Sequence, residues 1–170
     1  VNVLAKGDPI GASKIVDVAV GSYGSWSIID AKRSKVYTYN ENGELLFVFA
    51  DKGGQVGNVQ SAAAITYNGS DILVLDNTQN TITIYKRTEY GDLLLNALRC
   101  EDERLYDEAA ENWRGIIQRN SNFDAAYIGV GRMLYRSGQY KEAMEYFRSA
   151  YDTENYSSAF SSYRRDIVSK

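Results

Sequence analysis

The stretch GQYKEA at residues 138–143, followed by Phe147, decides the fold of the second half of this chain. A related stretch, RLYDEA, stands 34 residues earlier at 104–109 and is followed by Trp113. Tyrosine, glutamate and alanine recur at matching offsets in the two stretches. A period of this length predicts helix–turn–helix units that stack side by side.

The residue types at this period suit closely packed helices. Small Ala109 and Ala143 allow antiparallel helices to approach, and Trp113 and Phe147 follow four residues later on the same helix face. Gly131 is the small residue expected in the partner helix. The pattern predicts helices over about 92–103, 107–119, 124–137, 141–152 and 158–168, with Gly138 ending one of them and with Asp107, Asp124 and Ser157 as caps or first-turn residues.

The first half repeats with a period of 46 residues, which separates Asp30 from Asp76. Each aspartate ends an apolar stretch and precedes a β-branched and aromatic one, VYTY at 36–39 or ITIY at 82–85. Apolar alternation and Asn-Gly turn signals indicate short antiparallel strands. The two aspartates are predicted to cap turns.

The two periods predict an α+β chain whose halves are segregated. Residues 1–88 are expected to form two antiparallel β-meander units behind a stray N-terminal strand, and residues 89–170 two helical hairpins and a capping helix. The start at Val1, without a methionine, indicates an internal portion of a longer protein. Residues 1–4 are predicted to pair with the open edge near 81–86, in the same chain or in a neighbour, so edge-strand self-association is expected.

Histidine is absent from the sequence, and Cys100 is its only cysteine. Ser-His-Asp, Cys-His and histidine–zinc chemistries therefore lack their residues in this chain, and an intramolecular disulfide is impossible. We expect a protein that is not an enzyme and has no catalytic residue, metal or cofactor, with Cys100 as a buried thiol. The carboxylates at 101–103 and 107–108 are interpreted as a solvated helix end.

The charge distribution argues against a polyanionic partner. The net charge is -3, and residues 89–170 carry 11 basic and 14 acidic side chains. Because phosphate binding requires a basic excess, no nucleic-acid partner is expected. No apolar run approaches the roughly 18 residues of a membrane span, so we expect a soluble stretch that does not itself insert into a membrane.

The β half resembles NHL-type β-propeller blades over about residues 13–88. In such blades an apolar strand ends in Asp and a second strand leads to a glycine-containing hairpin, and the matching stretches here are 27–30 with 39–43, and 72–76 with 85. The helical half resembles tetratricopeptide repeats. Because propellers normally need four or more blades, the resemblance implies that the parent protein has further blades.

Together the two halves are similar to a family of bacterial extracytoplasmic proteins in which NHL-like blades run directly into tetratricopeptide units, here through residues 88–91. Members generally have a signal peptide and more blades upstream and a multi-span membrane domain downstream, and they often accompany sugar-type ABC transporters. The resemblance implies a membrane-associated scaffold at the cell surface, held there by parts of the protein outside this chain. It also implies a protein or peptide partner, with transporter components among the candidates.

Tetratricopeptide ligands usually lie in the concave groove lined by the first helix of each unit. The exposed groove positions of the second unit are predicted to be Ala125, Ile128, Arg132, Tyr135 and Arg136. Two arginines four residues apart, with a tyrosine between them, suit a peptide or tail that carries carboxylates. In the other interpretation these charges are solvated and paired locally.

The aromatic residues of the β half offer an alternative function. Trp26, with Tyr23 and Tyr67, is expected either to stack on a small carbohydrate or peptide in a sensing domain or to pack between blades. Leu94 and Leu98 also have two interpretations. They line the helical groove, or they are buried against the preceding blade.

Overall fold

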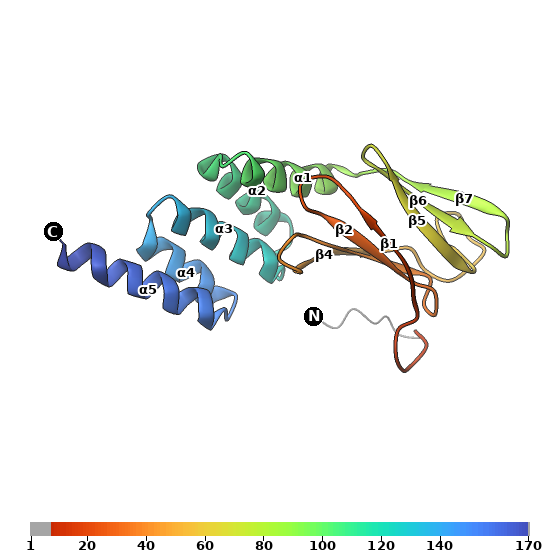
Figure 1. Ribbon diagram of the computed structural model, residues 1–170, viewed down its shortest axis with the longest axis horizontal. Coiled ribbons are helices and arrows are strands. Elements are labelled where there is room, and N and C mark those ends of the chain that lie inside the picture. The colour runs from red at the N-terminus through yellow and green to blue at the C-terminus, as the bar shows by residue number, and fades with distance from the viewer. Residues whose placement is uncertain (1–7, 170) are drawn as a thin grey trace. The chain divides into compact units, whose positions relative to one another are not determined.

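The computed structural model describes residues 8–169 of the chain. These residues divide into two compact units, and the boundary falls between Arg87 and Thr88. Within the described part, the first unit contains seven strands and the second contains five helices (Figure 1). The chain is therefore α+β with the two kinds of structure segregated, as its sequence predicts.

The first unit consists of two small antiparallel sheets, each a meander in which consecutive strands pair. Among the described residues the sheets form no closed propeller, and the predicted strand at residues 1–4 lies outside the part that the structure describes. The four-stranded sheet contains β1 (Ile15–Val20), β2 (Trp26–Asp30), β3 (Lys35–Tyr39) and β4 (Leu45–Phe49), and the three-stranded sheet contains β5 (Ala62–Asn68), β6 (Asp71–Asp76) and β7 (Thr81–Tyr85).

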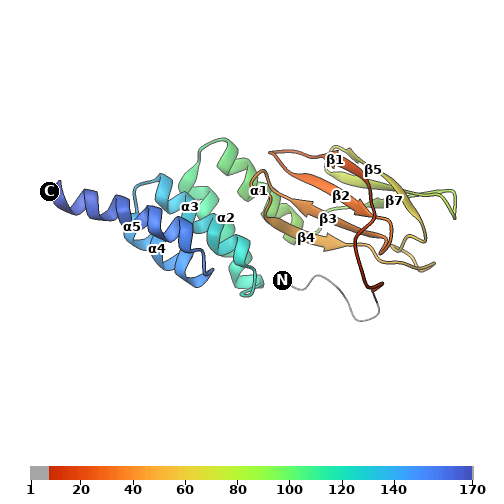
Figure 2. The ribbon, with the colours of Figure 1, turned by 60° about the horizontal axis from the view of Figure 1, so that its bottom comes forward.

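The core of the first unit lies between the two sheets, with β1 beside β5 (Figure 2). Alternation along each strand places Ile29 on the inner face of one sheet and Val74 on the inner face of the other, and both are fully buried. Two polar contacts also join the sheets. The Ile65 backbone N–H donates to Asp17 Oδ2 at 2.9 Å, and the Ser27 and Tyr67 hydroxyls lie 2.6 Å apart.

The two repeated aspartates cap equivalent turns, as predicted. Asp30 Oδ1 accepts hydrogen bonds from the backbone N–H groups of Lys14 and Lys32, while Arg33 donates to Oδ2 at 2.5 Å. Burial alone would raise the pKa of each aspartate, but the hydrogen bonds outweigh it and hold both pKa values below the ordinary one. The donors to Asp76 are the backbone N–H groups of Gln60, Thr78 and Gln79.

The second unit is a row of helices in which each packs against the next. None of the helices in residues 8–169 has the length and apolar character that crossing a membrane requires. Cys100 is buried, as predicted, and burial raises the pKa of its thiol. The helices are α1 (Glu89–Asp102), α2 (Tyr106–Arg119), α3 (Asp124–Arg136), α4 (Tyr140–Ser149) and α5 (Thr153–Val168).

The last helix begins five residues earlier than the predicted start at residue 158. Asp152 is its N-cap and accepts a hydrogen bond from the Asn155 backbone N–H at 3.0 Å, so the prediction that Ser157 caps this helix was wrong. Asn155 allows the early start because it supplies a backbone N–H that a proline would lack. Asp107 and Asp124 do lie in the first turns of their helices.

Glycine permits the closest helix contacts. A Cβ atom added to Gly131 would lie 2.6 Å from the Phe147 ring, and one added to Gly129 would lie 2.7 Å from the Trp113 ring. The first contact confirms the predicted role of Gly131, and the second was not predicted. Gly138 follows α3 in the left-handed region with φ 82°, and Arg104 takes a similar φ of 60° at the position 34 residues earlier.

Candidate partner-binding face

Four residues predicted to bind a partner lie on α3. Ile128, Arg132, Tyr135 and Arg136 have the offsets of a single helix face, four, seven and eight residues after the first. Arg136 is exposed in the last turn of α3, where the helix dipole favours a cation. We call this surface, together with Ser162 and Arg165 of α5, the α3 face.

Arg132 faces a buried carboxylate from α1. Its Nη2 atom lies 3.6 Å from Glu101 Oε2, and the two side chains are only 14% and 8% exposed. Glu101 Oε1 accepts a hydrogen bond from Trp113 Nε1 at 2.5 Å. The interpretation that charges here pair locally therefore holds for Arg132, because much of its charge is balanced inside the helical unit.

The burial of Glu101 corrects the interpretation of residues 101–103 as a solvated helix end. Glu101 lies on the same helix stripe as Leu94, Ala97 and Leu98, at i, i+3, i+4 and i+7, and all four are buried. This apolar spacing in the sequence of α1 could have predicted that Glu101 is buried. A carboxylate inside an apolar stripe requires a donor, and Trp113 and Arg132 meet this requirement.

Tyr135 is fixed by its neighbours on α4 and α5. Its hydroxyl lies 3.1 Å from Ser162 Oγ, and its ring meets the Tyr140 ring edge-on with centroids 5.4 Å apart. Arg165 Nη2 also donates to Ser162 Oγ, at 3.2 Å. Ser162 and Arg165 were missed as site residues, although Ser162 stands 34 residues after Ile128 and the helical period points to it.

Exposure along the α3 face is lower than predicted. Ala125 is buried, and Ile128 and Tyr135 are half-buried. The expectation that all five positions are exposed was therefore wrong, since Arg136 alone among them is exposed. The contacts of Arg132 and Tyr135 explain why, because α3 has partners on both α1 and α5. Leu94 and Leu98 are also buried, on the stripe of α1 that contains Glu101.

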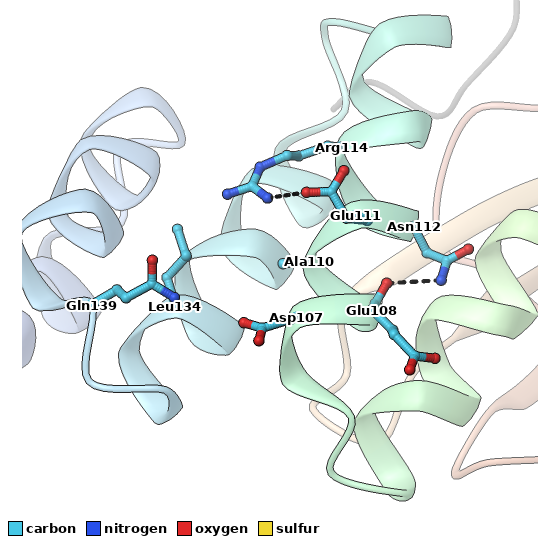
Figure 3. Close-up of a pocket in the computed structure, with 8 residues that line it drawn as sticks. All are labelled: Asp107, Glu108, Ala110, Glu111, Asn112, Arg114, Leu134 and Gln139. Atoms are coloured by element: carbon cyan, nitrogen blue, oxygen red, sulfur yellow. Dashed lines mark hydrogen bonds and ion pairs between the residues drawn. The ribbon is translucent and has the colours of Figure 1, made fainter.

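Surface pockets are present among the described residues of the helical unit. One, of about 460 Å³, adjoins the α3 face, because Arg165 lines it together with Arg164 and Val168. Another, of about 490 Å³, lies between α2 and the turn from α3 to α4 (Figure 3). It is lined by Asp107, Glu108, Ala110, Glu111, Asn112, Arg114, Leu134 and Gln139.

The pocket beside α2 contains none of the predicted site residues, and its cation is held by neighbours. Arg114 pairs with Glu111 at 2.5 Å and Glu142 at 3.0 Å, and it donates to the Tyr146 hydroxyl at 3.1 Å. Within residues 8–169, no group of three or more cysteine, aspartate or glutamate side chains is arranged to hold a metal ion.

Trp26 lies on the outer face of the four-stranded sheet. It stacks on Tyr39 with ring centroids 4.6 Å apart, and its Nε1 atom donates to the Asn40 carbonyl at 2.9 Å. Strand alternation places it opposite Ile29, which faces the second sheet, so Trp26 does not pack between the two described sheets. The ring is half-buried, with one face covered by Tyr39.

Tyr67 and Tyr23 are the other two aromatic residues of the predicted sensing site. Tyr67 points into the interface between the sheets, and burial raises the pKa of its hydroxyl. Tyr23 lies in the turn before β2 with a left-handed φ of 53°. Tyr67 therefore does not join Trp26 and Tyr39 in an aromatic platform on the outer face.

No protein-family model matches the sequence, and no curated protein matches it significantly.

Proposed function

We propose that this chain is a non-catalytic scaffold that binds a partner protein or peptide along the α3 face. The observation that carries the proposal is the fixing of Tyr135, which contacts Ser162 on one side and Tyr140 on another. Side chains held in place before binding lose less conformational entropy when the partner arrives. Tyrosine and arginine are also the residue types enriched in protein interfaces.

The charges of the face favour a partner that carries carboxylates. Arg136 and Arg165 are exposed, whereas Arg132 is balanced by Glu101. Exposed guanidinium groups can each make two parallel hydrogen bonds to a carboxylate. An acidic peptide would therefore be bound by Arg136 and Arg165 at its charges and by the Tyr135 ring at its apolar part.

The repeat assignment belongs to the same proposal. Helical hairpins at a 34-residue period support a tetratricopeptide array, and paired sheets at a 46-residue period support NHL-like blades. We place the parent protein at the outer surface of a bacterial membrane, with transporter components among its partners. This location rests on the resemblance of the sequence.

The proposal is tested with a panel of acidic peptides labelled for fluorescence anisotropy. The Arg136→Ala/Arg165→Ala variant is compared with Arg148→Ala, which removes an exposed arginine from the last turn of α4. We expect the double variant to weaken binding about tenfold or more, since each lost bond is charge-assisted. Arg148→Ala should bind as the unaltered chain does. Equal affinities for all three proteins would rule out the α3 face.

A second candidate is a sensing domain for a small carbohydrate or peptide. The observation that favours it is the stacked pair of Trp26 and Tyr39, with Trp26 half-exposed. Because Trp26 and Trp113 are the two tryptophans of the chain, a Trp113→Phe background isolates the fluorescence of Trp26. A saccharide that protects Trp26 from acrylamide quenching would support this function. Unchanged quenching across a saccharide panel would exclude it for those ligands.

A further inference from the structure

The turns inside the two helical hairpins carry opposite charges at equivalent positions. Asp102 is the last residue of α1, and Asp107 is the second residue of α2. The residues 34 positions later are Arg136, the last of α3, and Lys141, the second of α4. All four side chains are exposed. The repeat therefore keeps the position of these charges and reverses their sign.

Two of these charges are disfavoured by their own helices. Asp102 is an anion at the C-terminal end of α1, and Lys141 is a cation in the first turn of α4, so the helix dipole opposes both. Within residues 8–169, neither side chain has a hydrogen bond or an ion pair that would offset this cost. Because local sequence rules are broken mainly where a residue has a function, these two positions indicate a binding surface.

The two turns lie at one edge of the helical unit. Consecutive helices are joined by short turns and pack against each other, so they run antiparallel, and α1 and α3 end where α2 and α4 begin. The pocket beside α2 agrees with this arrangement, because Asp107 at one turn and Gln139 of the other both line it (Figure 3). We call the edge that carries Asp102, Asp107, Arg136 and Lys141 the hairpin edge.

The hairpin edge has an acidic half and a basic half. In the acidic half, the two aspartates and the exposed Glu108 outweigh Arg104 of the same turn. In the basic half, Glu142 pairs with Arg114 at 3.0 Å and leaves the two cations in excess. Because both turns project from the same end of the helices, only a second molecule can bring one half against the other.

We propose that two copies of this chain form a symmetric dimer through the hairpin edge. A two-fold axis that passes between the two turns, in the plane of the edge, brings each acidic half against the basic half of the other copy. Asp102 then faces Arg136 of the other copy, and Asp107 faces Lys141 of the other copy. Each contact forms twice, and the assembly closes as a dimer because the interface is isologous.

The dimer is weak and sensitive to salt. Exposed ion pairs each contribute little and are screened at high ionic strength. The complementary charges fix the register of the two copies, and Leu105, which is 38% exposed in the acidic turn, adds apolar contact. The inference goes beyond the proposed function. Asp107 and Lys141 are outside the α3 face, so the dimer can be disproved while the α3 face still binds its partner.

Reversal of single charges tests the proposal. Asp107→Lys and Lys141→Glu each place like charges in both copies of one contact, while Glu154→Lys, in the first turn of α5 at the opposite edge, is the control. Molar mass is measured by light scattering at low ionic strength over a range of concentrations, and circular dichroism verifies that each variant is folded. The unaltered chain and Glu154→Lys should approach the mass of a dimer, and each of the other two variants should remain a monomer.

Lys141→Glu also separates loss of the dimer from loss of the fold. A glutamate in the first turn of α4 is favoured by the helix dipole, so this variant should have a higher melting temperature than the unaltered chain when both are monomeric. A variant that is more stable and yet monomeric has lost the contact and has kept its fold.

The double variant Asp107→Lys/Lys141→Glu is the decisive sample. It restores opposite charges at this contact, so it should dimerise again, and about 0.5 M NaCl should dissociate both it and the unaltered chain. A monomeric unaltered chain at every concentration overturns the proposal. So does a mass above that of a dimer, a dimer that persists in salt or in either single variant, or a double variant that stays monomeric.

Discussion

The two units of the chain use repetition differently. In the helical unit, Trp113 and Phe147 occupy the same repeat position and are both buried. In the β unit, Ile29 and Leu75 also share a repeat position, yet Ile29 is 0% exposed and Leu75 is 37% exposed. A repeat therefore sets the residue type and the local conformation, but a neighbouring element determines whether the residue is buried.

The reason lies in the number of apolar surfaces per element. In the helical unit each helix packs against the next, within a hairpin and between hairpins, so stacked neighbours bury a continuous core. A sheet with apolar residues on both sides has two apolar faces. Two stacked sheets cover one face each, so apolar residues on the outer face of the three-stranded sheet, such as Leu75 and Ile82, remain exposed.

The largest effect is expected at the helical interface. Trp113→Ala removes a fully buried ring and should lower the free energy of unfolding by about 3–5 kcal/mol. The measurement is denaturant unfolding followed by circular dichroism at the helix band. Tyr151→Ala is the control, because that ring is almost fully exposed and its loss should change stability little. Similar losses for both variants would contradict the assignment of Trp113 to the core.

The next prediction compares two equivalent positions of the β repeat. Ile29→Ala should cost about 2–5 kcal/mol, as expected for a buried aliphatic side chain. Leu75→Ala, at the same repeat position, should cost less than about 1 kcal/mol when measured in dilute solution, since the side chain is already partly solvated. Equal losses of stability for the two variants would show that Leu75 is covered in the folded chain. The distinction between inner and outer faces would then fail.

The third prediction compares alanine substitutions at two helical glycines. Gly129→Ala places a methyl group 2.7 Å from the Trp113 ring and should destabilise the chain by about 1–3 kcal/mol. Gly115→Ala is the matched variant, because a Cβ at Gly115 meets nothing within 4 Å and alanine favours the helix by about 0.5–1 kcal/mol. The two substitutions should therefore have opposite signs in thermal unfolding. A stabilising Gly129→Ala would refute the close contact.

The smallest effect concerns the aspartates that cap the β repeat. Because the folded pKa of Asp76 is lowered, its ionised form stabilises the fold above the ordinary carboxyl pKa of about 3.9. That stabilisation is lost as pH falls from this value through the folded pKa. Asp76→Asn should cost about 1 kcal/mol at neutral pH and should reduce the loss of stability in acid. Unfolding free energies measured from pH 7 to pH 2 provide the check, and Asp51→Asn, at an exposed loop position, should retain the unaltered acid response.

Much of the fold follows from local sequence signals. The helices of the second unit follow its 34-residue period, and Asp30 and Asp76 cap turns because each supplies acceptors to N–H groups two residues later. The predicted start of α5 at residue 158 was wrong because the N-cap at Asp152 is a local signal that competes with the repeat period. Ile128, Arg132, Tyr135 and Arg136 do share one helix face, since their spacing alone fixes that.

The sequence by itself thus determined the two periods, the segregation of strands and helices, and the residue types that the repeats require. Only the tertiary structure decided that Glu101 is buried beside Trp113 and Arg132 and that Tyr135 contacts Ser162. It also decided that Ile29 is buried on an inner sheet face while Leu75, at the same repeat position, is exposed on an outer one. The physical reason is the distance along the chain over which each kind of interaction acts. Periodicity, capping and strand alternation depend on neighbours along the chain, whereas the burial and pairing of a side chain depend on elements brought together by folding.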